Sequence, residues 1–524
     1  MNSSEFIPSV LVGKGIIVPA SYRDPLISSY RNNPLIEALP HIFSEEEAMM
    51  CLSNYPTYDE DERQLPSHLR LHLVQNALQF VAPLPTHLDL EQRFSRMIRS
   101  GYQARNPLIA DFWREFQKRI DGLSSQNITP TRLRSTATGF TIIGISGVGK
   151  TTAVEAILSL YPQVIIHSQY CDRNLTLMQI VWLKLDCPFD GSIKGLCLNF
   201  FQAVDDLLGT NYYRNLAGGG RRTVDELIPN MARVASLHCI GVLVIDEIQH
   251  LNEAKSGGYK KMLNFFVQVV NTIGIPVVLV GTYKAMPVLS GEFRQTRRAS
   301  GQGDLVWDRM AEDEVWDLFV ESLWRYQYVR KPCSLKPDLS HVLYEVTQGI
   351  TDFAVKVYML AQIRAIVTEK EVVTASIIRS VAKDSLRLAQ PILSALQSGN
   401  IQALQKFEDV RPLDINVYIE EALKNLKVVG KINSSPTIQK SLMSNQEDEN
   451  IALNSYDIKP AINQKDVNGD SQIQSKKNQR KRQQDSLDKG SLVNIASFGV
   501  NEGITVYEAL KQKGYICSAT EYLI

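Results

Sequence analysis

One stretch of the sequence has the residue types and spacing that bind the phosphates of a nucleotide: Gly144-Ile145-Ser146-Gly147-Val148-Gly149-Lys150-Thr151-Thr152. It fits the pattern G-x-x-x-x-G-K-T, in which backbone N–H groups surround the phosphates and a helix N-terminus adds partial positive charge. We expect Lys150 to reach the β- and γ-phosphates and the Thr151 hydroxyl to bind Mg²⁺. The alternative is a glycine-rich turn without a nucleotide. An apolar run at 140–143 and helical spacing over 153–158 favour phosphate binding.

Two later apolar runs end in polar residues that suit hydrolysis of a nucleotide. The run 241–245 is followed by Asp246 and Glu247, which is the Walker B pattern. We expect Asp246 to hold Mg²⁺, mostly through water, and Glu247 to polarise the attacking water. The second run ends at Thr282, which is placed to contact the γ-phosphate or the attacking water. Each residue alone could be an ordinary strand end, but their order after the glycine-rich loop predicts ATP hydrolysis.

Three arginines lie within five positions shortly after Thr282: Arg294, Arg297 and Arg298. Such a cluster is usually an exposed charged face of a helix. Phosphoryl-transfer sites shared between subunits, however, need an arginine that neutralises charge in the transition state. The position of the cluster suits an arginine offered to a neighbouring subunit, and its spacing gives no basis for choosing one of the three.

Composition limits what the whole chain can be. At 524 residues it is too long for one compact domain, and 56 basic and 56 acidic residues give a net charge of zero. Any nucleic-acid binding must therefore come from local clusters of basic residues. The seven cysteines form no C-x-x-C pair, so we expect reduced thiols. No run reaches the roughly 20 apolar residues of a membrane helix and no signal peptide is recognisable, which predicts a cytoplasmic protein.

The periodicity of apolar residues predicts an α/β fold in five parts. The parts are an N-terminal extension (1–85), an α/β core with a parallel sheet and helices on both faces (86–308), a helical lid with following helices (309–430), a disordered linker with a basic patch (431–495) and a C-terminal docking segment (496–524). In the core we expect a helix over 88–118 that is broken at 101–107, strands at 163–166 and 180–185, and helices over 193–208 and 224–237. In the lid we expect helices over 314–329, 339–347, 352–368 and 374–388, and one ending near 426.

The flanking parts each leave two interpretations open. The extension, with its many prolines, is either an arm that docks on a partner or a subdomain packed on the chain's own core. The basic patch 476–482 either attracts DNA without sequence preference or keeps the linker soluble. The last residues are again apolar beyond a flexible tether, which favours a peptide that docks on a partner.

Several longer motifs, taken in order, resemble one protein family. They are 31–40, 101–107, the glycine-rich loop, 161–165, 183–187 with 191–192, 197–201, 243–251 and 262–266. The chain is similar to the TnsC family of AAA+ ATPases, which regulate target-site choice in heteromeric, TnsABC-type bacterial DNA transposons, including CRISPR-associated ones. The resemblance covers about 30–396, the last twenty residues more weakly, and hardly any of the linker.

This resemblance implies an AAA+ P-loop ATPase that acts as a molecular switch with ATP and Mg²⁺ as cofactors. Its ATP-bound subunits would form a ring or helical filament on double-stranded DNA without reading the sequence. The assembly would link a TnsD- or TniQ-like targeting protein, or an RNA-guided complex, to TnsA- and TnsB-like transposase subunits, and hydrolysis would take it apart. By position, Lys184 and Lys194 are candidates for facing the DNA, although either alone could be an ordinary surface lysine.

The sequence departs from the AAA+ pattern at the start of a predicted lid helix. Many AAA+ proteins carry an arginine in a Gly-x-x-Arg pattern there, whereas this chain has Gly349 followed by Asp352. Either Lys356, one helical turn later, takes the place of the arginine, or the lid is only weakly coupled to the nucleotide. Two other functions also stay open: an AAA+ loader or signalling ATPase outside transposition, and a nucleotide-binding adaptor whose ATP is structural.

Overall fold

The structure is a computed structural model that describes residues 15–110, 114, 137–253, 265–266, 270, 274–286, 289 and 303–399. The chain divides into two units, Met1–Ser435 and Pro436–Ile524, and all described residues belong to the first unit. The arginine cluster at 294–298, the helix predicted to end near 426, the linker and the C-terminal segment therefore lie outside the described residues. Predictions about them stay predictions.

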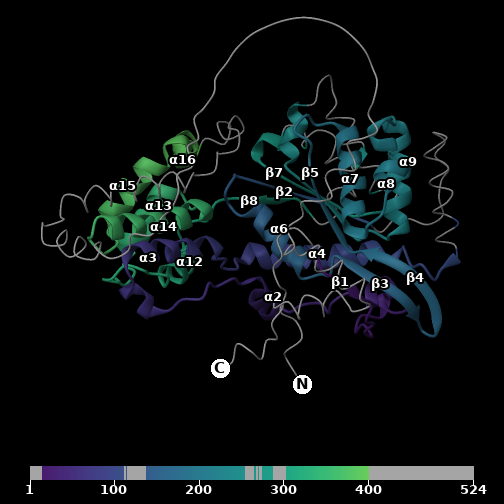
Figure 1. The fold of residues 1–524 in the computed structure, drawn as a ribbon, viewed down its shortest axis with the longest axis horizontal. Helices are drawn as coiled ribbons and strands as arrows, with labels where there is room; N and C mark the ends of the chain where they lie inside the picture. The colour runs from purple at the N-terminus through teal and green to yellow at the C-terminus, as the bar shows by residue number, and fades with distance from the viewer. Residues whose placement is uncertain are drawn as a thin grey trace, which may run out of the picture. The chain divides into compact units, whose positions relative to one another are not determined.

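Five parallel strands form the central sheet of the core (Figure 1). They lie in the order β5 (Trp182–Asp186), β6 (Val242–Asp246), β7 (Val277–Gly281), β2 (Phe140–Gly144) and β8 (Leu305–Trp307). Every residue of β2, β6 and β7 is buried. Strands buried on both faces need unbroken apolar runs, which is why their sequences show no alternation of apolar and polar residues. The predicted parallel sheet is confirmed.

The strand order brings together three segments that are distant in the sequence. Strand β7 pairs with β6 on one side and with β2 on the other, all in parallel. Parallel strands end at the same edge of a sheet, and ligands bind outside that edge. The glycine-rich loop after β2, Asp246 at the end of β6 and Thr282 after β7 therefore meet at one place.

Helices cover both faces of the sheet, as predicted. Successive residues of a strand point to opposite faces. Ile142 of β2 packs in one hydrophobic cluster with residues of α4 (Pro85–Gln103) and α6 (Lys150–Ser159). The next residue, Ile143, packs in a second cluster with residues of α7 (Ile193–Leu208) and α9 (Val224–Leu237). Two faces with separate apolar cores hold the sheet rigid, and its edge can therefore position a site.

Helix α4 differs from its prediction at its C-terminal end. It continues through Gly101 to Gln103, where the sequence predicted a break from 101 onward. A Cβ atom at Gly101 would lie 2.6 Å from Cγ of Pro276, so the glycine serves close packing and not a turn. The Tyr102 hydroxyl donates a hydrogen bond to the Cys239 carbonyl at 2.9 Å. Packing against the residues just before β6 and β7 thus extends the helix.

A second sheet of three strands was predicted only in part. It consists of β1 (Ile17–Pro19), β3 (Val164–Tyr170) and β4 (Arg173–Ile180), with β3 and β4 antiparallel. The sequence predicted one strand across 180–185, but β4 ends at Ile180 and β5 begins at Trp182. The turn between β3 and β4, Cys171-Asp172, has positive φ at both residues. A type I′ hairpin usually signals itself with glycine or asparagine there, so this hairpin was not recognisable.

The first part of the N-terminal extension packs on the core. Strand β1 pairs in parallel with β3, and α1 (Pro34–Glu37) packs against α4. Asn33 donates a hydrogen bond from Nδ2 to the Tyr102 carbonyl at 2.8 Å and accepts one from Leu35 N, which caps α1. Of the two interpretations of the extension, these residues fit the one in which it packs on its own chain.

The lid after the core is helical, as predicted. It contains α12 (Glu314–Trp324), α13 (Pro337–Thr347), α14 (Thr351–Val367), α15 (Ala375–Ser385) and α16 (Gln390–Gln397). The first helix ends five residues before its predicted end, because backbone groups of residues 327 and 328 bond to other segments instead of continuing the helix. Helix α14 is buried on nearly every side, as an apolar helix at the centre of a bundle must be.

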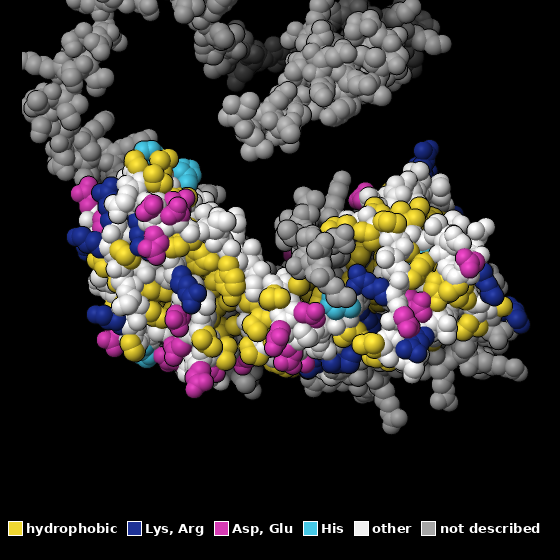
Figure 2. All heavy atoms as spheres, turned by 90° about the horizontal axis from the view of Figure 1, so that it is seen from below, with side chains coloured by type: hydrophobic (Ala, Val, Ile, Leu, Met, Phe, Trp, Pro, Cys, Tyr) yellow, Lys and Arg dark blue, Asp and Glu magenta, His cyan; other side chains and the backbone are white. Residues whose placement is uncertain are grey.

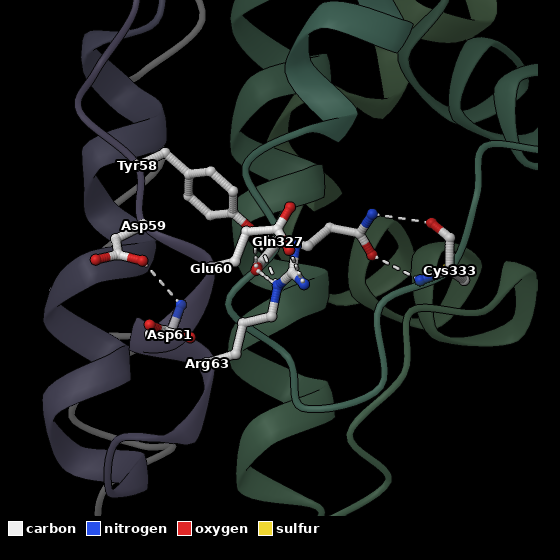
Figure 3. A network of polar contacts seen from close by, with 7 residues as sticks. All are labelled: Tyr58, Asp59, Glu60, Asp61, Arg63, Gln327 and Cys333. Carbon is white, nitrogen blue, oxygen red and sulfur yellow. Dashed lines mark hydrogen bonds and ion pairs between the residues drawn. The ribbon is translucent and has the colours of Figure 1, made fainter.

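The second part of the N-terminal extension completes this bundle. Helix α14 packs against α3 (Ser67–Leu73) and the 3₁₀ helix η3 (Val74–Gln79). Figure 3 shows Tyr58 and Arg63 converging on the backbone of Gln327, whose carbonyl accepts from the Tyr58 hydroxyl at 2.7 Å and from Arg63 Nε at 3.1 Å. The lid is therefore built from two segments some 250 residues apart in the sequence, as the separation of Arg63 and Gln327 shows.

A buried ion pair joins these two segments. Arg70 donates from both terminal nitrogens to the carboxylate of Glu371, at 2.8 and 2.7 Å. The side chains are 1% and 12% exposed. Arg70 also donates to the carbonyls of Leu65 and Tyr328, so the guanidinium is held by partners from both segments. Burial alone would raise the pKa of Glu371, but its bonds to Arg70 and to the Arg330 amide lower it on balance.

Two observations concern the class of protein. Within the described ranges, no helix has both the length and the apolar character that a membrane crossing requires. The cysteines of the described residues are free thiols, and Cys187, Cys197 and Cys239 are buried. Burial raises the pKa of Cys197 to about 12, so this thiol stays protonated near neutral pH.

We predict that Arg70→Met lowers the free energy of unfolding by about 3–5 kcal/mol, because it leaves the carboxylate of Glu371 without its buried partner. Urea unfolding followed by circular dichroism measures the loss. The control is Arg379→Met, which removes one partner of the exposed pair Arg379–Glu345 and should cost less than about 1 kcal/mol. Equal losses in the two variants would contradict a structural role for the buried pair.

Candidate functional site

A cavity of about 290 Å³ opens at the C-terminal ends of β2, β6 and β7. Three parts of the chain line it: the core, the lid and the end of the N-terminal extension. The core contributes Ser146–Thr152, Asp246, Glu247, Gly281 and Thr282; the lid contributes Phe319, Thr351, Asp352 and Val355; the extension contributes Leu78, Phe80, Val81, Ala82 and Leu84, and His87 follows on α4. The residues predicted from the glycine-rich loop, from Walker B and from the third strand are thus brought together.

The glycine-rich loop has the backbone that phosphate binding requires. Gly147 and Gly149 have φ of 86° and 94°, in the left-handed region that glycine tolerates. Lys150 opens α6, is only 8% exposed, and donates from Nζ to the carbonyls of Gly144 and Ile145 at 3.0 and 2.7 Å. Its ammonium group is therefore held inside the loop, beside the backbone amides.

Thr151 and Asp246 form the oxygen pair expected of a magnesium site. The Thr151 hydroxyl donates to Oδ2 of Asp246 at 2.9 Å, and the Glu247 amide donates to Oδ1 at 2.9 Å. Hydroxyl and carboxylate oxygens are the ligands Mg²⁺ prefers, with substrate phosphates completing the shell. Within the described residues no group of three or more His, Cys, Asp or Glu could hold a metal. The donors present fit a magnesium ion that arrives with a nucleotide.

Glu247 has a left-handed backbone conformation, which Glu369 and Glu371 of the lid also have. Its φ is 58°, a left-handed value that costs a non-glycine residue about 1–2 kcal/mol. Strain of this kind gathers at functional sites. The side-chain amide of Gln249 donates to the Glu247 carboxylate, and the same amide's oxygen accepts from the Thr282 amide at 3.2 Å. Gln249 thus links the predicted water-activating residue to the predicted sensor.

The sequence predicted roles for Glu247 and Thr282 but none for Gln249. The residue stood in the motif 243–251, but nothing in its type or spacing predicted a bridge between two strand ends. The link depends on β7 lying beside β6, which only the fold provides. We therefore add Gln249 to the candidate site.

Lys184 lies in a different environment from the one predicted. Its ammonium group is within 2.9 Å of Glu155 Oε1, 3.4 Å of Asp246 Oδ2 and 3.7 Å of Asp186 Oδ1. Burial alone would lower the pKa of Lys184, but the hydrogen bond to Glu155 and the charge of Asp246 raise it on balance. Three carboxylates neutralise this charge, which argues against the predicted contact with DNA. Lys194 is half-buried in the first turn of α7, and its predicted role stays untested.

The sequence also missed the apolar wall of the cavity. This wall comes from residues 78–84 of the extension, and antiparallel hydrogen bonds between Val81 and Asn54 hold it in place. With the phosphates at Lys150, an apolar wall beyond them suits the flat base of a nucleotide, because ligand cavities combine apolar surfaces with a few polar groups. No sequence signal marks these residues, since they precede the glycine-rich loop by at least 60 positions.

His87 closes the wall as an uncharged side chain. It is 7% exposed, accepts a hydrogen bond at Nδ1 from the Leu84 amide at 3.0 Å, and meets the ring of Trp307 edge to face. Burial lowers the pKa of His87 to about 4. Because Nδ1 accepts, the neutral ring carries its proton on Nε2.

The lid reaches the cavity through the start of α14. The Asp352 amide donates to the Gly147 carbonyl at 3.1 Å, and Lys356 pairs with the Asp352 carboxylate at 2.6 Å. The position that would hold an arginine in many AAA+ proteins is thus an aspartate beside the glycine-rich loop, and its partner is the lysine one turn later. The arginines Arg294, Arg297 and Arg298 lie outside the described residues.

The match to a family model agrees with this core. Residues 133–289 match the family model described as an AAA domain. A Walker-type ATPase of Pyrococcus abyssi is 13% identical, with 60% of this chain and 87% of that chain covered and a TM-score of 0.33. Cdc6p of Pyrobaculum aerophilum is 14% identical, with 63% of this chain and 83% of that chain covered and a TM-score of 0.34. ORC2 of Aeropyrum pernix is 12% identical, with 60% of this chain and 85% of that chain covered and a TM-score of 0.31.

These comparisons go as far as the fold. No curated protein matches the chain. The solved structures are distant, and TM-scores below 0.5 carry no weight for what this chain binds. The matching family model, the order of the parallel strands and the helical lid together make this an AAA+ P-loop core.

We predict that His87 makes the protein sensitive to acid. Its pKa is lowered from 6.5 to about 4 on folding, so the unfolded chain binds the proton first as the pH falls below 6.5. Stability from this group is complete above pH 6.5 and is lost between 6.5 and 4, by about 2 kcal/mol at pH 5. Urea unfolding at pH 7.5 and pH 5 measures the loss.

The comparison variant is His87→Asn, whose side-chain oxygen can still accept from the Leu84 amide. It should lose about 2 kcal/mol less than the original protein between the two pH values. The buried His167 and His238, whose pKa values burial also lowers, are unchanged in both proteins. An equal loss in the two proteins would assign the acid sensitivity to groups other than His87.

Proposed function

We propose that this chain, whose core is an AAA domain, is an ATP-hydrolysing switch that assembles on duplex DNA and regulates DNA transposition. One observation carries the hydrolytic part. At a single sheet edge, the Thr151–Asp246 pair lies beside Lys150, and Gln249 bonds to both Glu247 and the backbone of Thr282. These groups match the three tasks of phosphoryl transfer: neutralising the phosphates, holding Mg²⁺ and orienting water.

In the proposed reaction each residue has one task. Lys150 leaves the carbonyls of the loop and donates to the β- and γ-phosphates. Thr151 and Asp246 would hold Mg²⁺, and the bound ion would neutralise developing negative charge. Glu247 accepts a hydrogen bond from the attacking water and so polarises the water. Gln249, which bonds to both residues, keeps the carboxylate of Glu247 turned toward Thr282.

The cavity lacks one element of this chemistry. No arginine is among the described residues that line it. Transition-state charge on the γ-phosphate is commonly stabilised by an arginine, which a neighbouring molecule can supply. An isolated subunit would therefore bind ATP but hydrolyse it slowly, and Arg294, Arg297 and Arg298 are the candidates for completing a neighbour's site. This supports an assembly in a ring or filament as the active form.

The DNA and transposition part of the proposal rests on the resemblance to the TnsC family. Among the described residues on the face shown in Figure 2, basic and acidic side chains are interspersed among apolar ones and form no extended basic surface. DNA binding would use local cations such as Lys194 and contacts to phosphates without sequence readout. The proposed partners are a targeting protein, or an RNA-guided complex, and the transposase subunits, in the bacterial cytoplasm.

Two other functions make different predictions. A structural-ATP adaptor would need no water-activating residue, so the linked Glu247 and Gln249 disfavour it. An AAA+ loader or signalling ATPase outside transposition would share the site and the assembly on DNA. Only its partners would differ.

We predict that Lys150→Ala abolishes ATP-dependent assembly on duplex DNA, because the phosphates lose their main cation. Glu247→Gln should still bind ATP and assemble, but its turnover should fall at least about 100-fold and its assemblies should persist, because the attacking water is not polarised. Electron micrographs with ATP and DNA, together with phosphate release, test both variants. Equal assembly of the original protein with and without ATP would overturn the switch.

Binding of a transposase through the C-terminal segment distinguishes a role in transposition from the other functions. We predict that the full chain binds a TnsB-like transposase in the presence of ATP and DNA, and that deletion of residues 496–524 abolishes this binding while ATP turnover is unchanged. Co-purification on immobilised DNA measures it. Retained binding by the truncated chain would exclude the segment, and no binding by the full chain would favour a role outside transposition.

A further inference from the structure

The start of helix α14 lies directly on the glycine-rich loop. The Gly147 carbonyl accepts from the Asp352 amide at 3.1 Å and from the Thr351 hydroxyl at 3.4 Å. A Cβ atom placed on Gly147 would lie 3.2 Å from Cγ2 of Ile350 and 3.5 Å from Cβ of Asp352. The first turn of the lid helix is thus in van der Waals contact with the loop that would bind phosphates.

The connection before α14 fixes this position. Gly349 has φ of 73°, and a Cβ there would lie 2.2 Å from the Met310 carbonyl oxygen. That carbonyl also accepts from the Tyr344 hydroxyl at 3.1 Å, and the Met310 amide donates to the Gly349 carbonyl at 3.0 Å. Ile350 is completely buried. Asp352 is therefore held at the cavity by packed neighbours on both sides.

The carboxylate of Asp352 faces the cavity with a cation beside it. Oδ2 of Asp352 would lie 3.8 Å from a Cβ atom placed on Gly147, and Asp352 lines the cavity. Lys356 Nζ lies 2.6 Å from the same oxygen, and the lysine side chain is only 15% exposed. An aspartate in the first turn of a helix with a lysine four residues later is a favourable arrangement without any ligand. The pair is therefore stable at rest.

A bound nucleotide would disturb this arrangement. Its phosphates are anionic, and they would share the loop with a carboxylate of the same sign. A carboxylate beside them opposes binding, and the phosphates compete with it for the only cation it is paired with among the described residues, Lys356. The ammonium group contacts the same carboxylate oxygen that lies 3.8 Å from a Cβ atom placed on Gly147, so it lies close to the loop.

We propose that Asp352 and Lys356 form a release element of the nucleotide site. Asp352 weakens the binding of nucleotide by repulsion and returns Lys356 to its resting pair when nucleotide leaves. Lys356 turns to the phosphates while nucleotide is bound. The proposal deepens the proposed function, because it assumes that this cavity binds a nucleotide. It develops the first of the two alternatives that the sequence left open, in which Lys356 takes the place of the arginine.

The consequence is a site tuned for turnover of nucleotide and not for retention. An arginine at position 352 would attract the phosphates and strengthen nucleotide binding, whereas the aspartate repels them and weakens it. The lid then stays in contact with the loop through backbone groups, and the charged pair responds to the phosphates. Lys356 would contact the nucleotide directly, whereas Asp352 acts on it through charge and through Lys356; neither is required to touch the attacking water.

The test measures equilibrium binding and dissociation of fluorescent ATP and ADP analogues. Asp352→Asn keeps the size of the side chain and removes its charge; we expect about tenfold tighter binding of both nucleotides and slower dissociation of ADP. Lys356→Gln should weaken ATP binding about tenfold. The matched control is Glu345→Gln, which removes the same charge elsewhere on the lid, where Glu345 pairs with Arg379, and should change neither constant.

The outcomes separate this inference from the proposed function. If the original protein binds no nucleotide, the proposed function fails. If it binds nucleotide and Asp352→Asn binds with unchanged or lower affinity, the release element is overturned while the ATPase proposal stands. Thermal unfolding of each variant identifies loss of folding, and Lys356→Gln provides an independent second measurement: unchanged ATP affinity in that variant also overturns the inference.

Discussion

A buried carboxylate needs partners, and the partners of Asp246 hold the site together. Its side chain ends an interior strand of the sheet, where an unpaired charge would be strongly destabilising. One oxygen accepts from Thr151 and lies near Lys184, and the other accepts from the amide of Glu247. This one group therefore ties the helix after the glycine-rich loop to two neighbouring strands and also fixes the backbone of Glu247.

Much of the core could be predicted because parallel strands and phosphate loops need particular local sequences. Unbroken apolar runs marked β2, β6 and β7, and the polar residues after them marked one edge. What could not be predicted depends on contacts between distant segments, or on a turn that lacks the usual turn residues. The carboxylates around Lys184 come from three different elements, and the hairpin at Cys171-Asp172 lacks the glycine that usually marks it. A one-dimensional pattern holds no information about either.

The cavity shows how the N-terminal extension takes part in the site. The same segment that completes the lid around α14 continues into the apolar wall at 78–84 and then into α4 of the core. Core, lid and extension each contribute one side; the extension runs directly into the core and packs against the lid. A nucleotide that touches the wall and the glycine-rich loop would thus restrict the lid through the extension as well as through Asp352.

The ion pair of Arg70 and Glu371 has a consequence for how this protein can be taken apart. A fragment that begins at the first helix of the core keeps every lid helix in its sequence, yet it leaves the apolar surface of α14 that α3 and η3 cover open to water. Such a fragment would be expected to aggregate during expression, and a loss of activity on truncation would then report solubility and not a missing docking contact. A truncated form of this protein should therefore keep α3 and η3 together with the lid helices that they cover.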